Sequence, residues 1–180
     1  VMPIRKINRY ISINLIKNFN IKDNVVFKTL YELCEKKNNL TIEDLGFLIG
    51  PIINSGGRIS SSKISAELLI SENFHIIKKK LLELIKLNKI RKDIEDKILK
   101  EINFKKLEKE NKDVIIYYSS KIKEGLIGII ASRLKDYFNK PSIVITASQD
   151  KLKGSGRSTT NYNIGSIIKK LVDNKLIDNG

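Results

Sequence analysis

Two glycine-rich segments of the sequence each hold one arginine, and together these residue types are suited to binding phosphate. Residues 50–58 have the sequence GPIINSGGR and residues 153–158 have the sequence KGSGRS. Glycine lets backbone N–H groups approach an anion closely, serine adds a hydroxyl donor, and arginine offers a planar fork that matches two phosphate oxygens. We expect both segments to form tight loops. Either segment alone is also compatible with a plain turn that carries an exposed arginine.

The sequence contains no complete catalytic centre. His75 is its one histidine and lies beside apolar residues at the start of an expected helix, where a packed or surface side chain is the better interpretation. The single cysteine, Cys34, has no histidine near it in the sequence to act as a base. No Asp-x-Asp or Asp-His-His cluster occurs, although a metal ion needs several converging ligands.

The composition is that of a folded cytoplasmic protein. Over 180 residues, 41% are hydrophobic and 30% are charged, which excludes a peptide, a fibre and a disordered chain. One cysteine cannot form an internal disulfide. The sequence also lacks an 18-residue apolar run and a signal-peptide pattern at its start.

The formal net charge of +14 has two explanations. A basic surface favours a polyanionic partner such as nucleic acid. However, only six of the 34 basic residues are arginine, and lysine, isoleucine and asparagine, all abundant here, have AT-rich codons. Codon drift and a functional basic face therefore both remain open, and the few arginines are the more informative cations.

The elements expected before residue 110 are all helices. Thr41 and Asp44 have the spacing of a capping box and predict a short helix that ends before residue 50. Apolar periodicity predicts further helices over residues 7–19, 25–34, 63–70 and 73–107. The last of these has a narrow apolar stripe, Leu87, Ile90, Ile94, Ile98 and Ile102, which is typical of a helix that connects two lobes.

After residue 113 the pattern changes to a βαβ unit. Residues 114–118 and 142–147 are β-rich, and residues 125–138 have helical periodicity. Such a unit joins two parallel strands through a helix. Residues 151–158 are expected to add a strand, and residues 164–172 a closing helix. The predicted fold class is therefore α/β with a mixed sheet.

Three segments in this order resemble the RecJ family of single-strand-specific DNA exonucleases, within the DHH phosphoesterase superfamily. They are residues 50–58, residues 125–134 (GLIGIIASRL) and residues 153–158, with a charged helix between the first two. The resemblance implies that residues 1–74 are the C-terminal part of the DHH catalytic lobe. It makes residues 75–110 the long connecting helix and residues 111–180 an incomplete DHH-associated lobe.

The resemblance also implies a function, a 5′-to-3′ exonuclease that hydrolyses single-stranded DNA with Mn²⁺ or Mg²⁺ in DNA repair and recombination. The protein would be a monomer, with other repair proteins as candidate partners. Arg58 would lie beside the metal centre on a phosphate, and Ser155 and Arg157 would hold the 5′ phosphate. The remaining substrate-binding residues would shape the two segments: Asn54, Gly57, Gly154 and Ser158. The helix after Gly125 would direct its positive end toward the strand.

Two departures from the family pattern leave alternatives open. The family's metal ligands would lie before Val1 and its Gly-Gly-His motif after Gly180, so the chain is expected to be an internal fragment that holds no metal site. Lys123 stands where the family often has a histidine. The alternatives are an inactive nucleic-acid-binding fragment and a DHH phosphoesterase that acts on short oligonucleotides. The long connecting helix favours the exonuclease.

Overall fold

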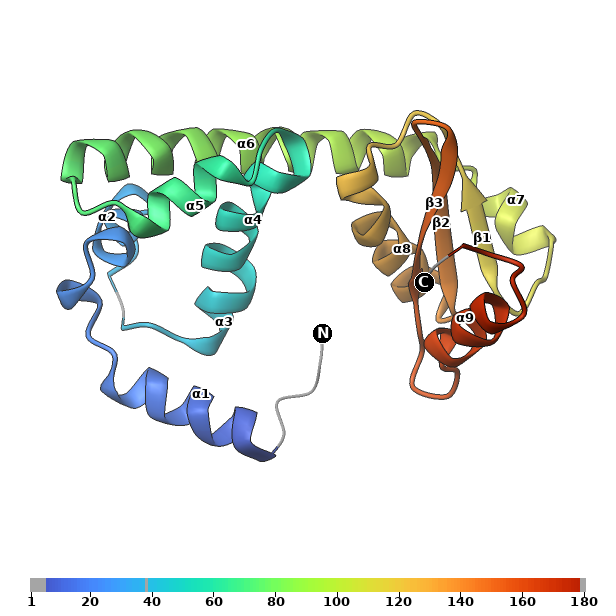
Figure 1. Cartoon of the computed structure of the whole chain (residues 1–180), viewed down its shortest axis with the longest axis horizontal. Helices are drawn as coiled ribbons and strands as arrows, with labels where there is room; N and C mark the ends of the chain where they lie inside the picture. The colour runs from blue at the N-terminus through green and yellow to red at the C-terminus, as the bar shows by residue number, and fades with distance from the viewer. Residues whose placement is uncertain (1–5, 38, 179–180) are drawn as a thin grey trace. The chain divides into compact units, whose positions relative to one another are not determined.

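The computed structural model describes residues 6–37 and 39–178 of the chain. A few residues of the expected segments lie outside the described residues. They are residues 1–5 and Asn38 of the segment 1–74, and residues 179–180 of the segment 111–180. The chain divides into two compact units, Val1–Arg91 and Lys92–Gly180, and the division falls within one long helix (Figure 1).

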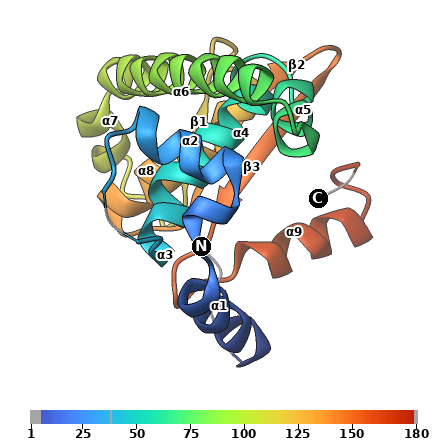
Figure 2. The same ribbon diagram turned by 90° about the vertical axis from the view of Figure 1, so that its left-hand side faces the viewer.

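The first unit is helical, and its elements follow one another along the chain (Figures 1 and 2). They are α1 (Lys6–Asn18), the 3-10 turn η1 (Ile21–Asp23), α2 (Val25–Leu33), α3 (Ile42–Asp44), the π-helical turn η2 (Leu45–Ile49), α4 (Gly50–Ile59), α5 (Lys63–Ile70) and the start of α6 (Phe74–Glu101). The predicted capping box is confirmed, because the Thr41 and Asp44 side chains each accept a hydrogen bond from the other residue's backbone N–H, at 3.1 Å.

The predicted loop at residues 50–58 is wrong, because the segment forms helix α4. The short helix expected to end before residue 50 instead runs through η2 into α4, with Pro51 in the first turn of α4, where proline is tolerated. None of the described glycines has a positive φ. Gly56 is needed for close packing, because an added Cβ would lie 2.8 Å from the Ser61 carbonyl oxygen and 2.9 Å from Ser65 Oγ.

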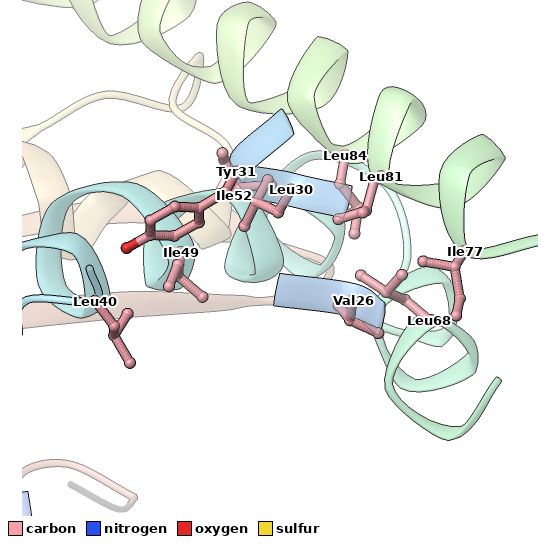
Figure 3. Packing of buried hydrophobic residues seen from close by; sticks show 10 residues of the cluster. All are labelled: Val26, Leu30, Tyr31, Leu40, Ile49, Ile52, Leu68, Ile77, Leu81 and Leu84. Carbon is pink, nitrogen blue, oxygen red and sulfur yellow. The ribbon is translucent and has the colours of Figure 1, made fainter. Parts of the chain in front are cut away.

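The core of the first unit fixes α4 against its neighbours. Ten buried side chains form this core (Figure 3): Val26, Leu30, Tyr31, Leu40, Ile49, Ile52, Leu68, Ile77, Leu81 and Leu84. The buried hydroxyl of Ser55 donates to the carbonyl oxygens of Ile52 and Leu84, at 2.6 and 2.9 Å. The second of these bonds ties α4 to α6, so the orientation of α4 is set by buried contacts on one side.

Helix α6 is shorter than the sequence predicted, and its buried stripe begins earlier. Of the five stripe residues expected from Leu87 onward, only Ile98 and Ile102 are buried. The helix ends at Glu101, and α7 (Phe104–Lys109) follows as a separate helix. Asn103 causes the break, because its side chain accepts the Lys106 N–H at 2.9 Å and so caps α7.

The second unit contains the predicted βαβ unit and mixed sheet. Strand β1 (Ile115–Tyr118) pairs in parallel with β2 (Ser142–Ser148), and β2 pairs antiparallel with β3 (Lys151–Arg157), in the order β1-β2-β3. Helix α8 (Glu124–Phe138) connects β1 to β2, and α9 (Ile164–Asp173) follows β3. The α/β class is therefore confirmed. The strand predicted over residues 151–158 is confirmed as β3. Residues 153–157 therefore pair with β2 and do not form the expected tight loop, and Arg157 lies opposite Ser142.

One face of α8 forms the core of the second unit. Its buried residues are Leu126, Ile127, Ile130, Ala131 and Leu134. The sheet contributes the buried Val144 and Thr146, and the Thr146 hydroxyl donates to the Ile122 carbonyl oxygen at 2.6 Å. Of the helices that the structure describes, none is long and apolar enough to cross a membrane.

Candidate functional site

Helix α4 brings three of the predicted site residues onto one side. Asn54, Gly57 and Arg58 are spaced by three and four residues, which places them on the same helical face. Asn54 and Gly57 are exposed and Arg58 is half-buried. The buried residues of α4 form its other side: Ile52, Ser55 and Gly56. A polar face with one arginine therefore lies opposite the face that packs into the core.

Gly57 and Gly56 differ in how much space the surrounding atoms leave for a side chain. A Cβ on Gly57 would meet Ser62 Cβ at 3.5 Å, which is ordinary van der Waals contact, whereas a Cβ on Gly56 would overlap the backbone of Ser61. Close packing therefore explains why residue 56, which the sequence analysis did not single out, must be glycine. It does not explain the glycine at position 57.

Strand β3 places Ser155 and Arg157 together on one face. Side chains alternate along a strand, so these two point to one side and Gly154 and Gly156 to the other. The Arg157 guanidinium donates through Nη1 to Ser155 Oγ at 3.3 Å and to the Gly156 carbonyl oxygen at 2.8 Å. Arg157 is exposed. The pair combines a hydroxyl with a planar cation, which together can bind two oxygens of one phosphate.

Gly128 of α8 lies against this pair. A Cβ on Gly128 would stand 2.7 Å from Nη2 of Arg157 and 3.1 Å from Ser155 Oγ. Gly128 belongs to the segment 125–134, but sequence reasoning did not name it as a site residue. The available signal was the spacing of Gly125 and Gly128, because glycines three residues apart on a helix leave one side open to a close neighbour.

An ion pair holds the start of α8 beside β3. The Glu124 carboxylate accepts from Lys153 Nζ at 2.7 Å and from Ser148 Oγ at 2.9 Å. The hydrogen bond from Lys153, with that from Ser148, holds the pKa of Glu124 below its ordinary value. Helix N-termini carry partial positive charge, so the Glu124 carboxylate lies between two positive groups, the start of α8 and the Lys153 ammonium.

Of the other two predicted residues of this segment, Ser158 shapes its connection to α9 and Gly154 does not. The Ser158 hydroxyl accepts the Ile164 N–H at 3.0 Å. A Cβ on Gly154 would make only ordinary contacts, the nearest at 3.6 Å from Ile145 Cγ1, whereas one on Gly156 would lie 2.9 Å from Ile164 Cγ2. Gly156, which the sequence did not name, is thus the glycine that lets α9 approach the sheet.

No metal-binding cluster occurs among residues 6–37 and 39–178, where no three His, Cys, Asp or Glu side chains converge. The ring of His75 lies 5.8 Å from that of Phe74 at the start of α6. Burial raises the pKa of the half-buried Cys34 thiol, although Lys36 opposes the shift, which disfavours the thiolate that nucleophilic catalysis needs. The described residues therefore do not fit a divalent metal.

The structure assembles two groups of predicted residues and places them in different units. Asn54, Gly57 and Arg58 share a face of α4 in the first unit, and Ser155 and Arg157 share a face of β3 in the second. Both groups contain an arginine on a defined element of secondary structure. Each group alone is suited to contacting phosphate.

Comparison with protein families finds a match in the second unit and relatives along most of the chain. Residues 111–175 match the family described as "DHHA1 domain". The chain is 32% identical over 151 residues to the single-stranded-DNA-specific exonuclease RecJ of Salmonella typhimurium, which covers 80% of the chain and 26% of that protein. It is 34% identical over 139 residues to RecJ of Haemophilus influenzae, covering 73% of the chain and 24% of the relative.

Solved structures show the same fold. RecJ from Thermus thermophilus in complex with Mg²⁺ superposes with a TM-score of 0.76 at 21% identity, covering 96% of the chain and 27% of RecJ. The complex with Mn²⁺ gives a TM-score of 0.77 at 20% identity, covering 95% of the chain and 25% of RecJ. The chain thus spans about a quarter of the length of the proteins it matches.

Proposed function

This chain is homologous to the RecJ single-stranded-DNA-specific exonucleases over most of its length and contains a DHHA1 domain, and from that relationship we propose that it is part of a 5′-to-3′ exonuclease. Its substrate is single-stranded DNA, and its portion of the enzyme binds the phosphates of the strand. The observation that carries the proposal is the grouping of Arg157 and Ser155 with Gly128 at the start of α8.

In this proposal Ser155 and Arg157 hold the terminal 5′ phosphate of the strand. The guanidinium presents two donors in one plane and the serine hydroxyl a third, which together neutralise and orient a phosphate. Gly154 and Ser158 belong to the same binding segment, with Ser158 fixing the turn into α9. An oriented 5′ end places the next phosphodiester bond at a fixed distance along the strand, which gives cleavage its polarity.

Arg58 is proposed to contact the phosphate at which hydrolysis occurs, with Asn54 and Gly57 on the same face of α4. The buried hydrogen bonds of Ser55 hold this face in place, so the arginine can act as a preorganised donor. Mg²⁺ or Mn²⁺ would supply an activated water for phosphodiester attack. The described residues offer no cluster that would hold such an ion, so we place its ligands outside residues 6–37 and 39–178.

The proposed domain organisation follows the same relationship. Residues 1–74 are the C-terminal part of a DHH lobe, residues 75–110 connect the lobes, and residues 111–180 form the DHH-associated lobe. We further propose that the protein acts in the cytoplasm as a monomer in DNA repair and recombination, together with other repair proteins.

The proposal is tested by Arg157→Ala in the complete enzyme. We expect its rate on 5′-phosphorylated single-stranded DNA to fall by about 100-fold, the effect of removing one preorganised donor to a developing charge. Lys151→Ala is the matched control, because Lys151 is a basic residue of the same strand whose partner is Asp178. Unchanged turnover in Arg157→Ala would sink the proposed role of this segment.

A second candidate function is favoured by the lack of a metal cluster among the described residues. The chain by itself would then bind single-stranded nucleic acid without hydrolysing it. Incubating the purified chain with Mn²⁺ and end-labelled single-stranded DNA distinguishes the two activities. Binding without loss of label supports this second function for the chain alone, and degradation from one end contradicts it.

A further inference from the structure

The contact between α8 and β3 leaves room for only a hydrogen atom at Gly128. An added Cβ would lie 2.7 Å from Nη2 of Arg157, 3.1 Å from Ser155 Oγ and 3.6 Å from Cζ of Arg157. Real Cβ atoms almost never approach another heavy atom to less than 3.0 Å. The obstructing atoms belong to the two side chains proposed to hold the 5′ phosphate, so a larger residue at position 128 would act directly on that pair.

The atom nearest to Gly128 is also the end of a flexible side chain. Arg157 is exposed, and its two hydrogen bonds, to Ser155 Oγ and the Gly156 carbonyl oxygen, both stay within its own strand. A methyl group at position 128 could therefore be accommodated by moving the guanidinium, without moving helix or strand. The expected consequence is a displaced arginine in an otherwise intact unit.

The other glycines of this region lack that property. A Cβ on Gly156 would meet Ile164, and one on Gly154 would meet the side chains of Ile143 and Ile145 and the Val144 carbonyl oxygen, so neither would meet Arg157 or Ser155. Among glycines 46, 50, 56, 57, 128, 154, 156 and 165, Gly128 alone faces both Arg157 and Ser155.

We infer that Gly128 is a positioning residue for recognition of the 5′ phosphate, and this inference rests on the proposed function. Its missing side chain lets the Arg157 guanidinium lie against α8 beside the Ser155 hydroxyl. Arginine side chains have many rotamers, and confining one in advance lowers the entropy lost when it binds. Gly128 thereby sets how strongly the protein distinguishes a 5′-phosphorylated end from a 5′-hydroxyl end.

The test compares the affinity of the chain for two fluorescent oligothymidylates that differ only in their 5′ end. The wild-type chain should bind the 5′-phosphorylated strand more tightly than the 5′-hydroxyl strand. Gly128→Ala should reduce this preference by about tenfold, the loss expected for a weakened hydrogen bond to a charged group. Its affinity for the 5′-hydroxyl strand should stay unchanged. Gly46→Ala is the matched control, because a Cβ on Gly46 meets nothing within 4 Å.

A double-mutant cycle separates positioning from a general structural effect. In an Arg157→Ala background, Gly128→Ala should cause no further loss of the preference, because no guanidinium remains to be displaced. The thermal unfolding midpoint of Gly128→Ala should not fall below that of the wild type. A lowered midpoint, or an additional loss in the Arg157→Ala background, would overturn the positioning role.

The outcomes also distinguish this inference from the proposed function. A wild-type chain that binds both 5′ ends equally would overturn the proposed phosphate site and the role of Gly128 with it. A wild-type preference that Gly128→Ala retains in full would overturn only the role of Gly128.

Discussion

Gly128 on α8 and Arg157 on β3 lie so close together that a Cβ on the glycine would stand 2.7 Å from the guanidinium Nη2. The two residues come from separate motifs of the sequence, residues 125–134 and 153–158. Their contact joins the two motifs in space. The helix has no side chain at Gly128, and the Arg157 guanidinium of the strand lies against it. The Arg157 guanidinium can thus lie close to the backbone of α8 at Gly128.

Replacing Gly156 with alanine should destabilise the second unit. The new Cβ would lie 2.9 Å from Cγ2 of the buried Ile164, which anchors the first turn of α9. We expect the free energy of unfolding to fall by about 1–3 kcal/mol, the usual cost of overpacking, as measured by urea denaturation.

Gly154→Ala is the control for this substitution. It lies in the same strand, and its Cβ would make only ordinary contacts. Its loss of unfolding free energy should be clearly smaller, and an equal loss in both variants would contradict the assignment of Gly156 to α9 packing.

Arg133→Ala should also lower stability, because it removes a partner of a buried carboxylate. Arg133 Nε donates to Glu95 Oε1 at 2.6 Å, and the side chain of Glu95 is only 3% exposed. This hydrogen bond, with the nearby negative charge, raises the pKa of Arg133 above its ordinary value. Removing a hydrogen-bonding partner of a buried charged group costs about 1–3 kcal/mol, which chemical denaturation would show.

Arg133→Lys provides the comparison for that experiment. Lysine keeps the positive charge but loses the planar donor at Nε, so its stability should lie between those of the wild type and the alanine variant. If Arg133→Ala unfolds at the wild-type denaturant concentration, the pair does not tie α6 to α8.

Stability should fall in acid as Asp44 becomes protonated. Burial alone would raise the pKa of Asp44, but hydrogen bonds from the Thr41 hydroxyl and backbone N–H and the ion pair with Lys36 outweigh it and lower that pKa to about 2. A carboxyl whose folded pKa is depressed contributes stability above its unfolded pKa and loses it as the pH falls through the folded value. Asp44 should therefore contribute on the order of 2 kcal/mol near neutral pH and lose this between about pH 4 and pH 2.

The free energy of unfolding, measured by urea denaturation across this pH range, checks the Asp44 prediction. Asp44→Asn should remove this part of the pH dependence, since an amide does not titrate there. A variant that retained the full wild-type slope would rule out Asp44 as its source.

Patterns with a clear period predicted the secondary structure well. The Thr41 and Asp44 capping box formed as expected, because its hydrogen bonds are local to the first helical turn. The two parallel strands and the helix between them also formed within a few residues of the expected ranges. The break after Glu101 could not be predicted from the periodicity, since Asn103 ends the helix through one side-chain hydrogen bond and leaves the apolar spacing intact.

The backbone conformation of the glycine-rich segments could not be predicted from their local sequence. Both were expected to turn tightly, yet residues 50–58 are helical, and residues 153–157 lie in the strand that the sequence also predicted over residues 151–158. Glycine is compatible with loop, helix and strand alike, so the surrounding contacts decide its conformation.

The sequence by itself determined the elements with strong hydrophobic periods, the set of polar residues available for phosphate, and the resemblance that suggested their use. Only the tertiary structure decided what each glycine is for. Gly56 and Gly156 are required by packing, whereas Gly128 makes room for Arg157. The physical reason is that the role of a glycine depends on which atoms occupy the space beside its Cα. Those atoms come from segments distant in the sequence, which meet only when the chain folds.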